Sequence, residues 1–184
     1  LIGEWLMADC ERAWDLKWIG LRYFNVAGAG WPDLADDAVM NLIPMVLDRV
    51  ERGESAKIFG TDYDTPDGTC IRDYIHVLDL AEAHIAALDV LAEGRQPDHH
   101  TYNVGTGLGT SVREIVDGLR RVMGWEFPVE ELDRRAGDPP KLIGDPLSIG
   151  VDLGWKANNG VDEILTSAWE GWQAGPRPIT VPGS

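Results

Sequence analysis

The fold class of this chain is indicated first by the sequence VLDLAEAHIAALDVLAEG at residues 77–94 and the sequence TYNV at residues 101–104. The longer segment repeats apolar residues at the spacing of one helix face. These residues are Leu80, Ala81, Ile85, Leu88 and Leu91. Gly94 ends the predicted helix, and the shorter segment has the composition of a buried strand. A helix followed by a strand is typical of the crossover units of a parallel sheet.

The same order of elements occurs at the start of the chain. Residues 1–14 read as a helix with one apolar face, and Lys17 to Phe24 has the length and composition of a buried strand. The given sequence has no Ser, Thr, Asp or Asn before this helix that could serve as its N-cap. We therefore expect the chain to begin inside a helix, with further sequence upstream.

The remaining segments complete an α/β pattern. We predict helices at 41–52, 111–123 and 161–173, strands at 56–59 and 127–132, a loop at 25–40 and a turn region at 60–69. Asn41 is predicted to cap the first of these helices, and Ser111 with Glu114 has the spacing of a capping box. Residues 1–30 and 76–106 fit the C-terminal edge of a Rossmann-type parallel sheet, and residues 31–75 and 107–184 fit a second, smaller domain.

Composition limits the function classes. The net charge of -15 argues against binding to nucleic acid or to anionic membranes. A phosphate-bearing ligand would need a few well-placed arginines and backbone donors to overcome this field. A run of eighteen apolar residues is absent from the sequence, so we expect no membrane span. Cys10 and Cys70 are too few for a disulfide framework, and we expect reduced thiols in a cytoplasmic protein.

Three patterns suggest sites but fit them poorly. Gly105 to Thr110 lies between a predicted strand and a predicted helix, yet the third glycine of a dinucleotide-binding turn is replaced by Thr110, which favours a structural turn. Asp62 to Gly68 resembles the start of a calcium loop, but Pro66 takes a ligand position, which favours a solvated acidic turn. The histidines lack metal-ligand spacing, and His84 is expected to be hydrogen-bonded and partly buried. We therefore predict no metal site.

Five blocks in a fixed order carry a more specific signal. They are LRYFNVAGA at 21–29, NLIP at 41–44, IFGTDYDTPDGTCIRDYIHV at 58–77, YNVG at 102–105, and RRAGDP at 134–139. Together they closely resemble the UDP-glucose 4-epimerase family of extended short-chain dehydrogenases/reductases. The resemblance covers essentially the whole chain, and the block at 58–77 resembles a family signature.

The resemblance implies NAD as cofactor, a UDP-sugar as substrate, and a role for each matching residue. Phe24 would lie near the nicotinamide, and Asn25 near the sugar or its phosphate. Asn41 and Leu42 would offer amides to the diphosphate at a helix N-terminus. The remaining expected substrate contacts are Lys57, Ile58 and Phe59 at the uracil, Arg72 and Arg135 at the diphosphate, and Asp138 at the ribose. Taken singly, each also has an ordinary structural explanation, such as an Arg72–Asp73 ion pair or a core position for Phe59.

Enzymes of this family oxidise and then reduce C4 of the sugar. A Tyr takes the proton of the 4-hydroxyl, helped by a Lys four residues later. This sequence contains neither a Tyr-x-x-x-Lys pair nor a glycine-rich NAD loop. The resemblance places the catalytic residues upstream of Leu1, so we expect no catalytic residue within this chain. We expect the isolated chain to lack epimerase activity and tight NAD binding, and to associate through faces left without packing partners.

Several alternatives stay open. The chain could be a non-catalytic nucleotide-sugar binding module, or part of a nucleotide-sugar dehydratase, although the block at 58–77 favours an epimerase. Residues 61–71 also resemble UDP-xylose/UDP-arabinose 4-epimerases. Leu142 matches a site where side-chain bulk admits or refuses N-acetylated sugars, so UDP-GlcNAc/UDP-GalNAc remains an alternative. The resemblance further implies a homodimer of the full-length protein.

Overall fold

A computed structural model describes residues 1–36, 38–95 and 99–175, so the end of the predicted second domain, 176–184, lies outside the described residues. Among the described residues, four of the five strand pairs are parallel. The predicted α/β class with parallel strands is confirmed. Each helix in these ranges is too short or too polar to cross a bilayer.

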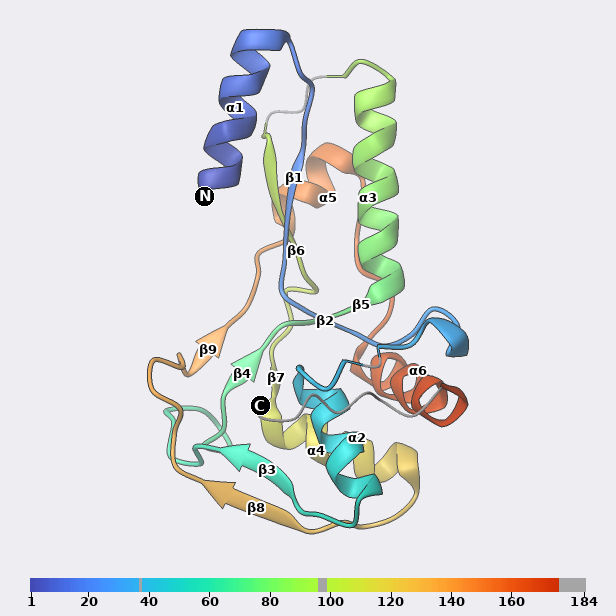
Figure 1. The fold of residues 1–184 in the computed structure, drawn as a ribbon. Coiled ribbons are helices and arrows are strands. Elements are labelled where there is room, and N and C mark those ends of the chain that lie inside the picture. Colours follow the sequence, from blue (N-terminus) through green and yellow to red (C-terminus); the bar gives the residue numbers. More distant parts are fainter. Residues whose placement is uncertain (37, 96–98, 176–184) are drawn as a thin grey trace.

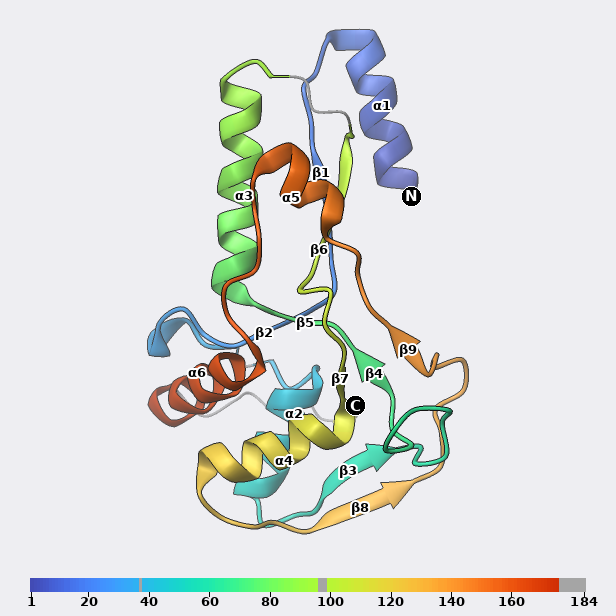
Figure 2. The same ribbon diagram turned by 180° about the vertical axis from the view of Figure 1, so that it is seen from behind.

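One part of the molecule is built from the two predicted helix–strand units. Its main elements are α1 (Ile2–Trp14), β1 (Gly20–Tyr23), α3 (Val77–Ala92) and β6 (Thr101–Val104). β1 and β6 pair in parallel, with Gly20 opposite Thr101, and α1 and α3 lie on opposite sides of this pair (Figure 1). Tyr102 and Val104 of β6 are buried against α3 and against α5 (Leu147–Leu153), which lies beside β6 and α3 in both views (Figure 2).

The buried face of α3 is not the predicted one. Ala83, Ala87 and Val90 pack into the core, whereas Ile85 and Leu88 are 58% and 63% exposed. Small side chains let the helix axis approach the strands closely, so the larger apolar residues of the stripe turn outward. His84 lies on the exposed side too: it is hydrogen-bonded to the carbonyl of Leu80, as expected, but it is not partly buried.

A second core holds the other predicted elements together. These are α2 (Leu42–Glu51), β3 (Ala56–Phe59), α4 (Val112–Met123), β8 (Val129–Leu132) and α6 (Val161–Ala174). The apolar residues of α4 recur at the spacing of one helix face, and three of them, Ile115, Val116 and Leu119, are fully buried in this core. The predicted capping box is also present, since Ser111 and Glu114 bond each other's backbone amides. α4 and α6 pack so closely that a Cβ on Gly118 would lie 2.3 Å from the Leu165 side chain.

Short strands join these two parts, and the sequence patterns did not predict them. They are β2 (Asn25–Ala27), β4 (Ile71–Arg72), β5 (Tyr74–His76), β7 (Thr110–Ser111) and β9 (Lys141–Leu142). The loop predicted at 25–40 therefore begins with a strand, and it also contains the 3-10 turn Pro32–Leu34. β2 pairs with β5, and β4 lies between β7 and β9. Strands of two or three residues depend on distant partners for their hydrogen bonds, and local periodicity cannot reveal them.

The two hydrophobic cores do not divide along the residue boundaries of the predicted domains. The predicted second part includes α5, yet Ile149 and Leu153 of that helix belong to the core formed with α3 and β6. The chain between α5 and α6 passes α3, where the Trp155 indole donates to the carbonyl of Asp79 at 3.0 Å. The two parts are thus connected by packing as well as by the short strands.

Candidate functional site

The largest group of sequence-predicted site residues meets in one cleft of about 560 Å³ beside α2, β3 and α6. The predicted residues that line it are Asn25, Asn41, Leu42, Lys57, Phe59, Arg72, Arg135 and Asp138. They come from segments that are far apart in the sequence, and the fold brings them to a common wall. The cleft therefore has aromatic, cationic and amide groups within reach of a single ligand.

The alternation of β3 decides which of its residues face the cleft. Ala56 and Ile58 are 0% and 1% exposed and pack in the core, whereas Lys57 and Phe59 line the cleft. The amides of Ala56 and Gly60 bond to the parallel strand β8. In parallel pairing, alternate residues bond the same neighbour, so the backbone groups of Lys57 and Phe59 point to the other edge. The side chain of Ile58 is thus a core residue rather than part of a ligand slot.

Two adjacent arginines have different surroundings. The guanidinium of Arg135 lies 4.0 Å from the centroid of the Phe59 ring, inside the cleft. The guanidinium of Arg134 lies 4.2 Å from the centroid of the Tyr63 ring and donates from Nε to Asp62 Oδ1 at 2.6 Å. This ion pair lowers the pKa of Asp62, chiefly through its hydrogen bond. Only Arg135 of the pair is placed to meet a ligand.

Arg72 forms an ion pair with Asp138 across the cleft wall, and its side chain is only 13% exposed. Its Nη1 also donates to the carbonyl of Ile71 at 2.8 Å. Arg72 contacts Oδ1 of Asp138, and the Cys70 thiol donates to the other carboxylate oxygen, Oδ2, with an Sγ–Oδ2 distance of 3.7 Å. The alternative of a local Arg72–Asp73 pair does not hold, because the Asp73 carboxylate accepts hydrogen bonds from Thr106, Gly107 and Gly144.

The first turn of α2 opens onto the same cleft. Asn41 occupies the predicted N-cap position with an extended backbone, but its side chain makes no capping hydrogen bond. The first amides of a helix need partners from outside the helix, and they carry partial positive charge. Asn41, Leu42 and Ile43 all line the cleft, so this turn can offer donors to an anion there.

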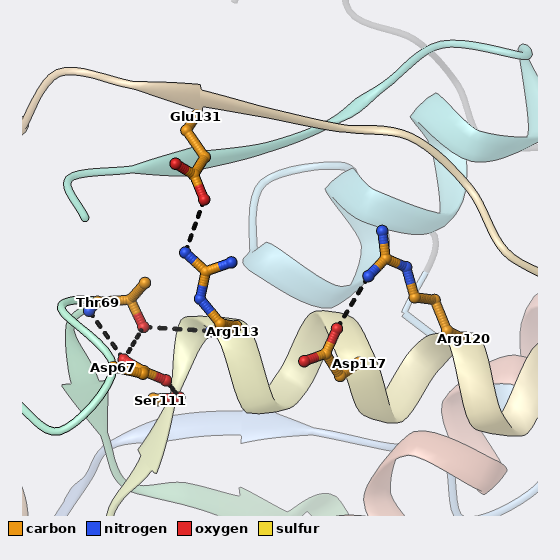
Figure 3. A network of polar contacts seen from close by, with 7 residues as sticks. All are labelled: Asp67, Thr69, Ser111, Arg113, Asp117, Arg120 and Glu131. Atoms are coloured by element: carbon orange, nitrogen blue, oxygen red, sulfur yellow. Dashed lines mark hydrogen bonds and ion pairs between the residues drawn. The ribbon is translucent and has the colours of Figure 1, made fainter.

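The acidic turn before Arg72 is held by a polar network against the start of α4 (Figure 3). Asp67 accepts from the amide and the hydroxyl of Thr69, both at 2.8 Å, and from the hydroxyl of Ser111. Burial raises the pKa of Asp67, but the hydrogen bonds from Ser111 and Thr69 outweigh it and lower the pKa overall. These hydrogen bonds therefore fix the conformation of the turn that leads into β4, and Arg72 of β4 lines the cleft.

The same network bears on the calcium-like pattern of this turn. Arg113, in the first turn of α4, donates its amide to Thr69 and pairs with Glu131 of β8 at 2.7 Å (Figure 3). Asp62 and Asp67, the first and sixth residues of the pattern, accept hydrogen bonds from protein donors. Within the described ranges, no group of three or more His, Cys, Asp or Glu side chains is arranged to hold a metal ion.

Besides Ile58, two predicted site residues lie outside this cleft. Phe24 follows β1, and its ring packs where a Cβ on Gly144 would stand, at 2.4 Å. Leu142 is 50% exposed on β9, where its backbone pairs with Arg72. Neither side chain lines the cleft that contains the other predicted residues.

Sequence reasoning also missed several residues of the cleft wall. Cys70, Tyr74 and Trp172 all line it. Cys70 and Tyr74 lie within the quoted block at 58–77, each two residues from Arg72 in the sequence, and this short spacing could have identified them as cleft residues. Burial strongly raises the pKa of the Tyr74 hydroxyl, which keeps this group neutral. Trp172 lies in the last predicted helix, 161–173; its indole donates to Glu51 at 3.2 Å and so fixes the ring at the edge of α2.

Comparison with known proteins places this chain in a family. Residues 1–105 match the model of the NAD dependent epimerase/dehydratase family. The UDP-glucose 4-epimerase of Rhizobium leguminosarum bv. trifolii is 40% identical over 177 residues, which is 94% of this chain and 53% of that protein. The chain thus spans about half the length of the curated relatives it matches.

Solved structures agree with this result. The crystal structure of UDP-glucose 4-epimerase from Brucella ovis in complex with NAD has a TM-score of 0.85 and 42% identity, covering 92% of this chain and 54% of that one. The enzyme from Bifidobacterium longum in complex with NAD+ and UDP has a TM-score of 0.80 and 32% identity, covering 96% and 53%. This chain belongs to the NAD dependent epimerase/dehydratase family.

Proposed function

We propose that this chain is the UDP-sugar-binding part of a UDP-glucose 4-epimerase. The observation that carries the proposal is the meeting of Phe59, Arg72 and Arg135 at one cleft. Two guanidinium groups offset the repulsion that a net charge of -15 exerts on a diphosphate. The ring of Phe59 supplies an aromatic face for a base, and relatives at 32–42% identity carry the same activity in their names.

The geometry supports a role for each cleft residue. Backbone groups of Lys57 and Phe59 on the open edge of β3 read the edge of the uracil, and Ile58 only supports them from the core. Arg72 and Arg135 bind the diphosphate, since guanidinium forks match phosphate oxygens. The amides of Asn41 and Leu42 add donors at the start of α2.

The remaining assignments concern the ribose, the sugar and the cofactor. Asp138 accepts from the ribose hydroxyls, and its ion pair with Arg72 places its carboxylate at the cleft. Asn25, which lines the cleft near the end of β1, contacts the sugar or its phosphate. Phe24 lies beside the nicotinamide of NAD. Bound NAD supplies the hydride acceptor and donor for C4 of the sugar.

Nucleotide titration tests the binding half of the proposal. UDP added to the 184-residue chain is expected to bind with 1:1 stoichiometry in isothermal titration calorimetry, and ADP is expected to bind much more weakly. The reason is that the free edge of β3 and the Phe59 ring suit one flat pyrimidine, whereas both nucleotides carry the same diphosphate. Equal affinity for UDP and ADP would contradict the base slot, and no affinity for UDP would refute the whole proposal.

Turnover is a separate prediction. The sequence contains no Tyr-x-x-x-Lys pair and no glycine-rich NAD loop, so the 184-residue chain is expected to leave UDP-galactose unchanged even with added NAD. Chromatographic separation of UDP-glucose from UDP-galactose after long incubation measures this directly. Conversion above the rate without protein would show that the chemistry resides in this chain after all.

The preferred sugar is a further part of the proposal. UDP-glucose and UDP-galactose are the leading substrates, with UDP-xylose/UDP-arabinose and UDP-GlcNAc/UDP-GalNAc as alternatives. Leu142, which resembles the family position that responds to N-acetyl groups, is half exposed on β9. Assays of the full-length protein on all three pairs distinguish them, and full-length protein that binds UDP without turnover would support a non-catalytic binding module. We also propose a homodimer for the full-length protein.

A further inference from the structure

A fully buried carboxylate stands at the point where the chain passes between the two parts of the molecule. Asp73 is 0% exposed and separates β4 from β5, which belong to different sheets. Its Oδ1 accepts from the amide of Thr106 at 2.9 Å and from the hydroxyl of Thr106 at 2.7 Å. Its Oδ2 accepts from the amides of Gly107 and Gly144, both at 3.1 Å.

The backbone of Asp73 makes further connections at the same point. Its carbonyl accepts from the amide of Asn25 at 3.0 Å, and its amide donates to the carbonyl of Leu142 at 3.1 Å. Its neighbours in the sequence, Arg72 and Tyr74, both line the nucleotide cleft. Asp73 itself does not line the cleft, so its influence on a ligand must pass through these neighbours.

From this arrangement we propose that Asp73 is a positioning residue for nucleotide binding. Its carboxylate holds the 105–107 turn and Gly144 in fixed places around the β4–β5 junction, and that junction aims Arg72, Tyr74 and Asn25 at the cleft. The inference rests on the proposed UDP binding, and it adds a residue to which neither the sequence nor the family resemblance assigned a role. In the Gly105–Thr110 turn, which resembles a phosphate loop, the amides of Thr106 and Gly107 thus donate to an internal carboxylate.

The chemistry of the cage makes the carboxylate specific. Each oxygen receives two donors, and a carboxylate can accept at both oxygens. An asparagine has one oxygen, so its NH2 group would face two donors at the other position, and a buried unmatched polar group is costly. Space is equally limited, because a Cβ on Gly105 would lie 2.5 Å from Asp73 Oδ2. Replacing Asp73 by asparagine or adding a Cβ at Gly105 would therefore force the β4–β5 junction to shift.

The test compares Asp73→Asn with a matched control, Asp79→Asn. Asp79 is also 0% exposed and also accepts from backbone amides, those of Asn158 and Asn159 at 3.1 and 3.0 Å, but it lies in α3 away from the cleft. Both variants are expected to lose thermal stability. Only Asp73→Asn is expected to raise the Kd for UDP by about tenfold or more in calorimetry, measured below both melting temperatures.

A second variant covers the case in which Asp73→Asn does not fold. Gly105→Ala pushes on the same carboxylate from a residue outside the nucleotide cleft, and it is expected to weaken UDP binding in the same direction. The inference is overturned if the altered proteins bind UDP like the unaltered chain, or if Asp79→Asn weakens binding as much as Asp73→Asn does. An unaltered chain without affinity for UDP instead overturns the proposed function on which the inference rests.

Discussion

Arg134 and Arg135 show how much a single residue position decides. Both are exposed arginines in one turn, and each lies over an aromatic ring. Arg134 is engaged by Asp62 outside the cleft, whereas Arg135 lines the cleft and lies over Phe59. Exposed ion pairs contribute little to stability, so the difference between the two should appear in binding rather than in folding.

A pair of conservative substitutions tests this difference. Arg135→Lys keeps the charge but loses the planar fork and most of the contact with the Phe59 ring, so the Kd for UDP is expected to rise about tenfold. Arg134→Lys serves as the matched control and is expected to leave the Kd unchanged. Calorimetric titration of both variants measures the effect. Equal losses in the two variants would contradict the assignment of Arg135 to the ligand.

At the scale of elements, α3 depends on the histidine that precedes it. His76 is 3% exposed; its Nδ1 accepts from the amide of Leu78 at 3.1 Å and caps the helix. Its Nε2 lies 3.0 Å from the hydroxyl of Ser167, which also accepts from the amide of Ala29 at 3.1 Å. One neutral ring thus joins α3, α6 and the loop after β2. Burial lowers the pKa of His76, against the opposing effect of Asp79 and Glu163.

This arrangement predicts a pH dependence of stability. Because the pKa of His76 is lower in the folded chain than its ordinary value of 6.5, the unfolded chain binds the proton more readily. The contribution of His76 is therefore present above pH 6.5 and is lost as the pH falls through the lower folded pKa. Protonation also turns Nδ1 into a donor and removes the cap, which costs about 1 kcal/mol.

Urea denaturation between about pH 5 and pH 8 measures this effect. His76→Asn keeps a capping acceptor without a titrating group and is expected to flatten the loss of unfolding free energy at low pH. His84→Asn, an exposed histidine of the same helix, is the control and should retain the slope. A slope that survives His76→Asn would assign the pH dependence to other groups.

At the scale of the whole molecule, α1 presents an uncovered apolar face. Ile2, Trp5 and Leu6 are 79%, 60% and 61% exposed, and none of the residues of this helix is buried. Ile85 and Leu88 are likewise exposed on α3, on the other side of the β1–β6 pair (Figure 1). Exposed apolar surface of this kind favours association.

The 184-residue chain is therefore expected to self-associate, and Trp5→Gln is expected to lower the associated fraction. Trp31→Gln is the matched control, because Trp31 is also 60% exposed but lies in the loop after β2. Sedimentation velocity and the fluorescence of a hydrophobic dye measure both effects. A monomeric unaltered chain that binds no dye would contradict the prediction, as would an equal effect of the two substitutions.

The sequence by itself determined the helices and strands whose patterns are local. The capping box at Ser111, the apolar face of α4 and the strand β3 follow from the spacing of neighbouring residues, and the structure confirms them. The order of the quoted blocks along the chain also led to the family, because a resemblance of that length needs no knowledge of contacts.

The tertiary structure alone decided the short strands, the buried side of α3 and the surroundings of each charge. β4 and β5 exist because partners from residues 25–27, 110–111 and 141–142 supply their hydrogen bonds. Asp73 acquired its cage, and Arg72 its pairing with Asp138, through segments more than thirty residues away. Sequence spacing reports on neighbours within a turn or two, whereas these interactions depend on which distant segments the two cores bring together.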